Sequence, residues 1–390
     1  MKILGLPADV GTPHVPLREL GQRRPIKACG WYRIAQPLEW IERLRLAEMD
    51  YGGFPIGYVV EYAREFTHVV LQRQVLKRFR NMVEHLRLLL HKKVVFDIDD
   101  LLLHLEPDSP AYVWWGEDPD KVYAVWQDLA AKGLVSPKHL GMKKDDVFAI
   151  ANENRNGLMW MLNNVDLLTF STSEIAVRYK EYTDVPIAVL PNCINPEDWE
   201  NVIPERVVPD GAIALGWAGS DTHAQDLQVM AWSVERVMRR NPNVWLVLVG
   251  WPEAKRFFSE DVQERIVTKP WAGLETYRRW VAGFDIGLAP AANTLTNAAK
   301  SGIRVYELAL ARPGGMAVVA SPWPYSQDIH DEMGTIAKTC PAFARAIEAY
   351  VQDEELRWWH GQRLRRHVLE HHTYEGNAWR WFEAYAQMEG

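Results

Sequence analysis

The chain has little cysteine and no long apolar run. Only three of its 390 residues are cysteines, Cys29, Cys193 and Cys340, and no two of them form a CxxC pair. The sequence therefore argues against a disulfide framework and against a zinc site. No segment approaches the ~18 consecutive apolar residues of a membrane span, and the first residues, MKILGLPADVG, lack the apolar core of a secretory signal. We expect no transmembrane segment and a reducing, cytoplasmic location.

The composition is that of a globular protein with more than one core. Hydrophobic residues make up 48% of the chain and charged residues 24%, and 390 residues are too many for one average core, so we expect two domains. Eighteen tryptophans are a high number. Aromatic-rich chains often bind sugars or flat ligands, but large aromatic side chains also fill cores, where we expect many of these to lie.

The charge is distributed unevenly. The net charge is −7, yet residues 1–93 carry sixteen Lys and Arg against nine Asp and Glu, an excess of +7 that leaves −14 for the remainder. A basic first segment indicates an anionic partner. The alternative is a solvated helix face with unequal numbers of the two charges.

Short apolar runs alternate with helical patterns along the chain. Such alternation predicts an α/β protein with parallel, doubly wound sheets. Four prolines between Pro191 and Pro209 indicate a linker near 195–210. The expected strands lie within residues 92–102, 166–172, 187–192, 212–220, 244–250, 284–290 and 315–321, and the expected helices include 71–90 and a Trp-rich tail, 356–388. We expect two domains, 1–200 and 201–370, facing across a cleft, and a C-terminal helix, 371–390, that returns to the first.

The segment TNAAKSGIRVYELAL (296–310) places several polar residues in an expected helix between two buried strands. If the helix begins near Asn297, a favourable N-cap residue, then Lys300, Arg304 and Glu307 share one face. One interpretation is an exposed stripe in which the Arg304–Glu307 pair contributes less than ~1 kcal/mol.

The second interpretation of this segment is a nucleotide site. The expected helix follows the carboxyl end of the strand at 284–290, so its free N–H groups and its dipole would favour a phosphate. Lys300 and Ser301 would add a cation and a hydroxyl. Glu307 could accept hydrogen bonds from ribose hydroxyls.

Several segments resemble the retaining glycosyltransferases of family 4, which have the GT-B fold of two Rossmann-like domains. The donor-binding signature of that family resembles FDIGLAP through NAAKSGIRVYELAL to VVASPWPY (284–325). Weaker similarities are found, in order, at CGWYRIAQPL (29–38), VVFDIDDLL (94–102), LLTFSTSE through INPEDW (167–199) and GWAGSDTH (216–223). The resemblance covers roughly residues 90–330.

The resemblance implies a donor site for a nucleotide-diphosphate sugar. Gly219 and Ser220 would lie against the diphosphate or the sugar, and Lys300 and Ser301 would hold phosphate. Glu307 would bind ribose. The implied substrate-binding residues are Arg33, Gly219, Ser220, Asn297, Ala298, Lys300, Ser301, Arg304 and Glu307, and the implied catalytic residues are Asp99, Asp100 and Lys300.

The sequence departs from the family pattern at two positions. The first of two glutamates in the family motif is replaced by Ala299, so the backbone near Asn297 and Ala298 would contact the sugar instead. Many members have a histidine where this chain has Asp99. Asp99 or Asp100 would then replace that histidine or act on the acceptor.

The implied reaction builds negative charge on a departing diphosphate. Positioned N–H groups and cations such as Lys300 and Arg33 would stabilise that charge. No cofactor or metal is then obligatory, although a divalent cation is compatible with the reaction. Trp271 and Tyr277 either stack on the nucleotide base or pack in the core.

The DIDD motif (97–100) has several interpretations. It could be a carboxylate turn that caps the next helix, an acceptor site, or a Mg²⁺ site of the DxD type. It could also carry an aspartyl nucleophile, as in haloacid-dehalogenase-like phosphatases, but phosphate transfer leaves the second domain unexplained.

Two questions of function stay open on the sequence. A non-catalytic protein that binds nucleotide sugars or carbohydrates is the alternative to the enzyme, and Ala299 and the missing histidine favour it. The basic first segment suggests an anionic acceptor: modified DNA, a lipid-linked phosphate glycan or a membrane-surface substrate.

Overall fold

The computed structural model describes residues 1–8, 26, 28–53, 56–135, 139–330 and 332–389, and the chain divides into two compact units. The first unit contains residues 1–191, 294–300 and 377–390, and the second contains 192–293 and 301–376. These divisions lie within ten residues of the expected ends at 200 and 370. The grouping of Thr294–Lys300 with the first unit has no counterpart in the sequence-based expectation.

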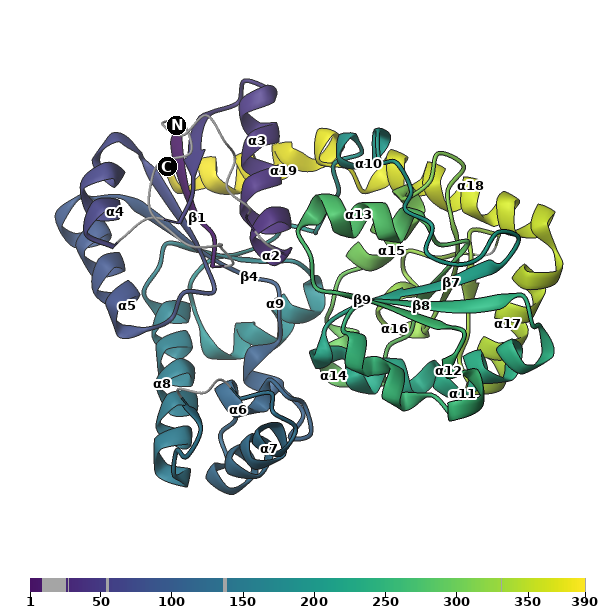
Figure 1. The fold of residues 1–390 in the computed structure, drawn as a ribbon. Coiled ribbons are helices and arrows are strands. Elements are labelled where there is room, and N and C mark those ends of the chain that lie inside the picture. The colour runs from purple at the N-terminus through teal and green to yellow at the C-terminus, as the bar shows by residue number, and fades with distance from the viewer. Residues whose placement is uncertain (9–25, 27, 54–55, 136–138, 331, 390) are drawn as a thin grey trace. The chain divides into compact units, whose positions relative to one another are not determined.

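The first unit is built on a six-stranded parallel sheet with strand order β2-β1-β3-β4-β5-β6. Its strands are β1 (Lys2–Leu6), β2 (Glu48–Tyr51), β3 (His68–Gln72), β4 (Lys93–Ile98), β5 (Leu167–Phe170) and β6 (Ile187–Val189). Its helices include α2 (Ala28–Gly30), which continues through a π-helical turn (Trp31–Ala35) into α3 (Gln36–Arg43), and α4 (Ile56–Tyr62), α5 (Lys77–Glu84), α6 (Tyr112–Trp115), α7 (Pro119–Ala131), α8 (Lys144–Asn163), α9 (Ser173–Tyr179) and α19 (Tyr374–Ala386) (Figure 1).

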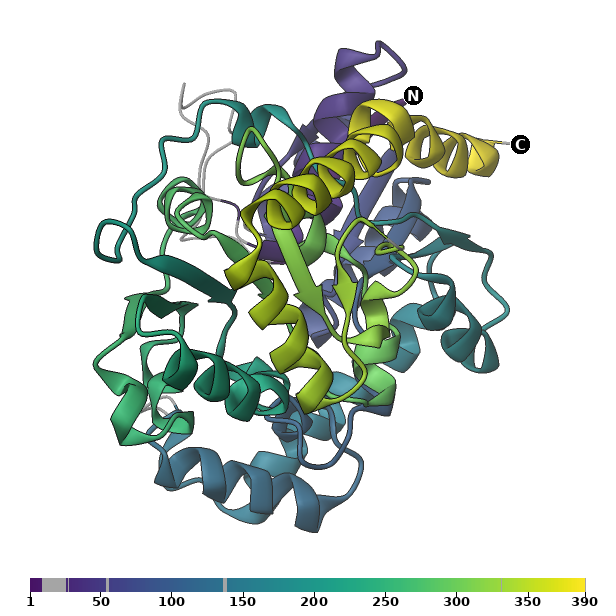
Figure 2. The same cartoon turned by 90° about the vertical axis from the view of Figure 1, so that its right-hand side faces the viewer.

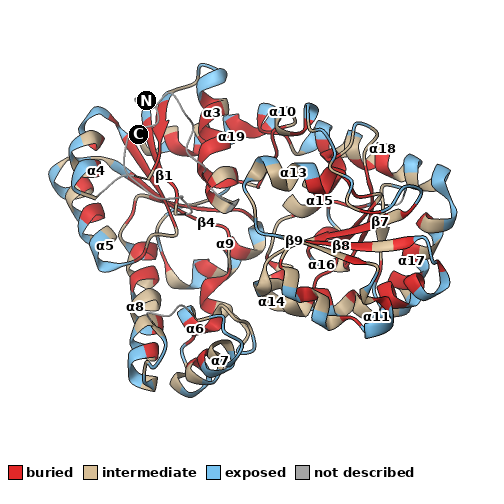
Figure 3. Cartoon of the chain, viewed as in Figure 1, coloured by how far each residue is buried: buried red, intermediate tan, exposed pale blue. Residues whose placement is uncertain are grey.

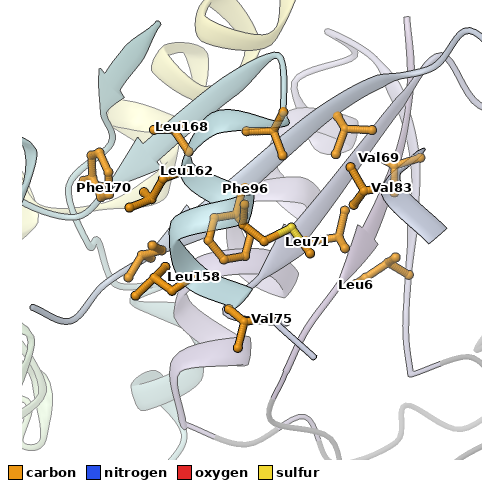
Figure 4. Close-up of a cluster of buried hydrophobic side chains, with 14 of the residues drawn as sticks. Leu6, Val69, Leu71, Val75, Val83, Phe96, Leu158, Leu162, Leu168 and Phe170 are labelled. Carbon is orange, nitrogen blue, oxygen red and sulfur yellow. The ribbon is translucent and has the colours of Figure 1, made fainter. Parts of the chain in front are cut away.

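The core of the first unit forms because its central strands are apolar on both faces, as buried parallel strands require. Val94, Val95 and Phe96 of β4 are fully buried. In Figure 4, Phe96 lies among side chains of β3, β5 and α8, including Leu71 and Leu158. This core holds the carboxyl end of β4, and with it the DIDD motif, in a defined place.

The second unit also contains a six-stranded parallel sheet, with strand order β12-β11-β10-β7-β8-β9. Its strands are β7 (Ile213–Ala218), β8 (Val244–Gly250), β9 (Ile266–Pro270), β10 (Ile286–Ala289), β11 (Ala317–Ala320) and β12 (Thr335–Ile336). Its helices include α10 (Glu197–Glu200), α11 (Ala224–Arg240), α12 (Glu260–Gln263), α13 (Leu274–Ala282), α15 (Ile303–Leu310), α16 (Pro322–Tyr325), α17 (Cys340–Gln352) and α18 (Glu354–His371). The short helix α14 (Leu295–Ala298), between β10 and α15 in the chain, groups with the first unit. Figure 2 shows α17 and α18 in yellow-green on the side that faces the viewer.

The strand order of the second unit reverses direction between β7 and β10. From β7 the chain adds β8 and β9 on one side, and then it returns to place β10, β11 and β12 on the other. Open α/β sheets bind ligands outside the carboxyl ends of the strands at such a reversal. The two segments that leave this point are the turn after β7 and the stretch after β10.

Two sequence-based expectations about elements are wrong. The helix expected over 71–90 begins at Lys77, because residues up to Gln72 belong to β3. The helix expected to begin near Asn297 is broken into α14 and α15, and residues 299–302 lie between them. Within the described residues, no helix combines the length and the apolar character that crossing a bilayer demands.

Candidate functional site

The turn after β7 depends on two glycines. A Cβ atom at Gly219 would lie 2.7 Å from the indole ring of Trp217, which is fully buried. Gly250, at the end of β8, has φ +98°, and a Cβ there would lie 2.7 Å from the carbonyl oxygen of Gly219. Since neither close approach tolerates a side chain, the backbone of this turn comes unusually near its neighbours. The Ser220 hydroxyl is hydrogen-bonded to Thr222 at 2.7 Å.

The stretch after β10 corrects the predicted position of the phosphate-binding helix. Thr294 caps α14 by accepting a hydrogen bond from the backbone N–H of Asn297 at 3.1 Å. The longer helix, α15, begins only at Ile303. Lys300 and Ser301 therefore lie in the link before α15 and not in a first helical turn.

Close packing explains why the helix breaks at this link. A Cβ atom at Gly302 would lie 2.1 Å from Oδ2 of the buried Asp328. The side chain of Asn192 donates a hydrogen bond to the Ser301 hydroxyl at 2.8 Å. The link is thus held from two sides within the second unit.

Arg304, in the first turn of α15, has an unsatisfied donor. Its Nη1 atom is buried and has no hydrogen-bond partner. Its guanidinium carbon lies 5.9 Å from the ring centroid of Trp217, the same indole that lies under Gly219. The fold therefore brings the turn after β7 and the start of α15 to one place. A buried guanidinium nitrogen without an acceptor costs free energy, and an anion would supply the acceptor.

Glu307, one turn further along α15, is oriented by a tyrosine. The Tyr277 hydroxyl donates to Oε2 of Glu307 at 2.9 Å. Burial and then the nearby Glu307 carboxylate raise the pKa of Tyr277 well above its usual value, so the phenol stays protonated and keeps donating. The Tyr277 hydroxyl is therefore engaged with the Glu307 carboxylate. Trp271, by contrast, is 56% exposed, lies beside Gly250 and is not part of the core.

A histidine and an aspartate that sequence analysis did not select join the same part of the second unit. His223 Nδ1 lies 2.7 Å from Oδ2 of Asp226, at the start of α11. The other carboxylate oxygen of Asp226 accepts from the backbone N–H of Ala292 at 2.8 Å, in the stretch after β10. The motif GWAGSDTH ends on this histidine, and the i, i+3 spacing to Asp226 was the available signal.

The remaining residues of the predicted sugar-binding stretch are anchored in the first unit. Asn297 is 6% exposed and Ala299 is 1% exposed. The carbonyl oxygen of Ala299 accepts from the Thr172 hydroxyl at 2.7 Å, and Thr296 donates to Glu106. Ala298 is half-buried, as is Lys300, and within the described part of the chain no carboxylate forms an ion pair with Lys300.

Arg33 does not present a free cation. It is 1% exposed and donates two hydrogen bonds to the Asp97 carboxylate, at 3.0 and 2.5 Å. It also donates to the carbonyl oxygen of Leu190 at 2.5 Å. The implied role of Arg33 in neutralising a diphosphate is corrected on this ground: its guanidinium is already committed to a buried carboxylate.

The same pair excludes two interpretations of the DIDD motif. Asp97 is 1% exposed and accepts a third hydrogen bond, from Thr169, at 2.7 Å. Its oxygens are thus unavailable as metal ligands or as a nucleophile. Within the described residues, no group of three or more His, Cys, Asp or Glu side chains is placed to hold a metal ion.

Asp99 and Asp100 are arranged differently from Asp97. Arg73 forms an ion pair with Asp100 at 2.6 Å, and its Nε lies 3.8 Å from Oδ1 of Asp99. Asp99 is 9% exposed, and its Oδ1 has no hydrogen-bond partner. Burial and then the Asp99 charge raise the pKa of the neighbouring Cys29 thiol well above its usual value. The Oδ1 atom of Asp99 thus lies near the Arg73 guanidinium without a hydrogen bond to it.

The basic excess of residues 1–93 is largely internal. Arg33, Arg73, Arg80 and Arg87 all pair with carboxylates that lie beyond residue 93: Asp97, Asp99, Asp100, Glu153 and Asp166. Arg18, Arg23, Arg24 and Lys27 lie outside the described residues. A count of charges up to residue 93 includes these arginines but leaves out the carboxylates that pair with them. The count therefore overstates the basic surface.

Comparisons with known proteins show which family model and which folds this chain resembles. Residues 227–383, in the second unit and the C-terminal helix, match the family model described as Glycosyl transferase-like. The structure of Anabaena HepE in complex with UDP-glucose superposes with a TM-score of 0.58 at 12% sequence identity, covering 99% of this chain and 100% of that one. The chain has the GT-B fold of glycosyltransferases. No curated protein matches it at the sequence level.

Other GT-B glycosyltransferases show the same similarity. Staphylococcus aureus TarM superposes with a TM-score of 0.51 at 13% identity, over 85% of this chain and 58% of that one. The UDP-forming trehalose-phosphate synthase of Burkholderia xenovorans gives a TM-score of 0.51 at 10% identity, over 85% and 77%. The predicted resemblance to GT-B glycosyltransferases and the predicted α/β fold are thereby confirmed.

Proposed function

We propose that this protein is a retaining glycosyltransferase that moves a sugar from a nucleotide-diphosphate sugar to an acceptor hydroxyl, and that its second unit binds the donor. The observation that carries the proposal is the buried Arg304 Nη1, which lacks an acceptor beside the indole that also underlies Gly219. A diphosphate supplies paired anionic oxygens at such a point.

Each donor-site residue has a role that suits its surroundings. Arg304 holds the diphosphate, and the Ser301 hydroxyl and the backbone at Gly219 and Ser220 add hydrogen bonds. Glu307, oriented by Tyr277, accepts from the ribose hydroxyls. Trp271, exposed beside Gly250, offers an aromatic face to the base. HepE, which has a similar fold, is in complex with UDP-glucose, so a UDP-sugar is the first donor to test.

The chemistry follows from where charge develops. The bond between the anomeric carbon and the donor phosphate breaks, a bond to the acceptor oxygen forms on the same face, and the acceptor proton leaves with the diphosphate. Arg304, Ser301 and the backbone N–H groups after β7 stabilise the negative charge on that leaving group. These residues do the work without an obligatory metal, although a divalent cation can assist.

The first unit receives the acceptor in this proposal. Asp99 has a nearly buried Oδ1 without a hydrogen-bond partner, and this atom can accept from an acceptor hydroxyl. Asp100 is held by Arg73 and orients the same group. We therefore assign to Asp99 the catalytic role that the resemblance gives to the histidine found at this position in many family members.

An anionic acceptor is the class we propose, among phosphate-bearing glycans, modified DNA and membrane-surface substrates. Its support is reduced to exposed basic residues of the first segment, among them Arg45, Lys77, Arg78 and Lys93. No disulfide joins the three cysteines, which fits the reducing cytoplasmic location that we propose.

The alternative function is binding without turnover. Ala299 is packed in the core of the first unit, so its side-chain position cannot supply the first of the two carboxylates in the family motif. A nucleotide-sugar-binding protein would retain Arg304 and Glu307 but release no nucleotide.

The test combines binding with turnover. Glu307→Ala should weaken UDP-glucose binding by roughly tenfold or more, because two charge-assisted hydrogen bonds are lost. Glu275→Ala, an exposed glutamate on α13, is the matched control and should bind as the parent does. Affinity is measured by calorimetry across UDP-, GDP-, ADP- and dTDP-sugars, and product configuration by NMR. Equal affinity in the two variants would refute the donor site, and binding without nucleotide release would favour the alternative.

A further inference from the structure

A second basic site lies on the outer side of the second unit, between α11 and α17. The two helices pack against each other, and both show exposed residues in blue on their outer faces (Figure 3). Between them is a groove of about 370 Å³. It is lined by Trp232, Arg236, Arg240, Pro341, Ala344, Arg345 and Glu348.

Side chains from one face of α11 and one face of α17 line this groove. Trp232, Arg236 and Arg240 are spaced four residues apart on α11, so they share one face of that helix. Arg345 and Glu348 lie on the facing side of α17. Neighbouring like charges at i, i+4 destabilise a helix, so the pair Arg236 and Arg240 is not explained by helix stability.

The three arginines of the groove lack the ion pairs that many other arginines of this chain form, among them Arg239 of α11. Within the described part of the chain, no carboxylate forms an ion pair with Arg236, Arg240 or Arg345. Arg239, on the same helix but turned away from the groove, pairs with both Glu235 and Asp261. The net charge of the whole chain is −7, so a lack of acidic residues does not account for the difference.

The one carboxylate of the groove is already engaged. Glu348 Oε1 accepts from the side chain of Asn241 at 3.0 Å. Arg236 lies over the Trp232 ring at 5.4 Å from the centroid, a contact that orients the guanidinium while its N–H groups stay available. Three guanidinium groups therefore line one small groove without anionic partners.

We propose that this groove binds a ligand carrying at least two phosphate groups, either free or repeated along a polymer. Arginine forks match phosphate oxygens in paired hydrogen bonds, and three of them require more than one anionic group for balance. The groove shares no residue with the donor site. The proposal is therefore independent of the function proposed above.

The test is calorimetry with inorganic pyrophosphate and with long-chain polyphosphate, with UDP present so that the donor site is filled. Arg236→Gln/Arg240→Gln and Arg345→Gln should each weaken binding by roughly tenfold or more. Arg239→Gln removes one positive charge from α11 outside the groove, as Arg345→Gln removes one within it. The Arg239→Gln protein should bind both probes as the parent does. All of these side chains are exposed, and circular dichroism checks that the variants fold.

The two probes separate the two sources of phosphate. Arginine-dependent binding of pyrophosphate supports a free ligand, and arginine-dependent binding of polyphosphate alone supports a polymer. The proposal is overturned if neither probe binds, or if Arg239→Gln loses as much affinity as the groove variants. UDP affinity should be unchanged in the groove variants, so a failed donor site and a failed groove give different results.

Discussion

At the scale of the residue, two arginines show how differently one side chain can be used. Arg33 is buried with its guanidinium held by Asp97 and by the Leu190 carbonyl, whereas Arg304 has a buried Nη1 without an acceptor. Breaking the first pair would leave an uncompensated buried charge and cost about 3–5 kcal/mol. Within the described residues no carboxylate forms an ion pair with Arg304, and an anionic ligand would supply the acceptor that its Nη1 lacks. Neither situation could be predicted from sequence, because both depend on partners from distant strands.

Asp328 is a buried carboxyl next to the link that precedes α15. The Tyr306 hydroxyl donates to its Oδ1 at 2.8 Å, and its Oδ2 lies where a side chain at residue 302 would have to fit. Burial raises the pKa of Asp328 from 3.8 to about 6, against a smaller opposing effect of the Tyr306 hydrogen bond. Nothing in the local sequence marks this aspartate as unusual.

The pH dependence of stability follows from that raised pKa. The folded protein holds the Asp328 proton more tightly than the unfolded chain, so this stabilisation is complete below about pH 4 and is lost as the pH rises through about 6. Asp328→Asn keeps an acceptor for Tyr306 but removes the titration. Between about pH 4 and about pH 7, the stability of the variant should rise relative to the parent by ~1–3 kcal/mol.

Urea unfolding of both proteins across that pH range measures the difference. His372, whose Nε2 lies 3.7 Å from Asp328, acts in the opposite direction. Burial and then His367 and His371 lower its pKa to about 4, so its contribution is present above about pH 6.5 and lost as the pH falls through 4. Both proteins contain His372, so a stability difference that does not change with pH would contradict the account of Asp328.

At the scale of the element, one glycine allows α8 to pack close to the chain that follows β3. A Cβ atom at Gly157 would lie 2.1 Å from the carbonyl oxygen of Val75. Because a backbone atom cannot move aside as a flexible side chain can, Gly157→Ala should destabilise the protein by about 1–3 kcal/mol. Gly57, in α4, has open space around the same position.

Chemical denaturation of the two alanine variants checks this packing. Gly57→Ala should leave stability unchanged or raise it slightly, since alanine favours helix over glycine. If Gly157→Ala unfolded at the same denaturant concentration as Gly57→Ala, the close approach of α8 would not be the reason for glycine at 157.

The strands that could be predicted are those with a continuous apolar run. The run at 244–250 matches β8 residue for residue, and β4, β5, β7, β10 and β11 lie inside their predicted segments. β1, β3 and β9 were not predicted. β2 was missed because its sequence, EMDY, contains two acidic residues, and β12 because it has only two residues. The break between α14 and α15 could not be predicted either, since the close approach of Asp328 to Gly302 is a tertiary contact.

At the scale of the whole molecule, length and the alternation of elements were sufficient to predict two α/β units. They could not predict that Thr294–Lys300 groups with the first unit, because contacts such as Thr172 with Ala299 join residues far apart in sequence. The basic excess of residues 1–93 overstates the basic surface for the same reason, because carboxylates that pair with four of its arginines lie later in the chain. Of the predicted donor-site residues, Gly219, Arg304 and Glu307 are placed in one part of the second unit, whereas Arg33 is a structural residue.

The central claim is that Arg304 is kept for the diphosphate of a nucleotide sugar. Calorimetric titration of the parent and of Arg304→Gln with UDP-glucose tests it most directly, together with their unfolding temperatures. We predict that the parent binds and that the variant binds roughly tenfold more weakly or worse. Its unfolding temperature should fall by no more than the lost contact with the Trp217 ring accounts for, because no ion pair is lost. Equal affinity in the two proteins, or no nucleotide-sugar binding by the parent, would contradict the claim.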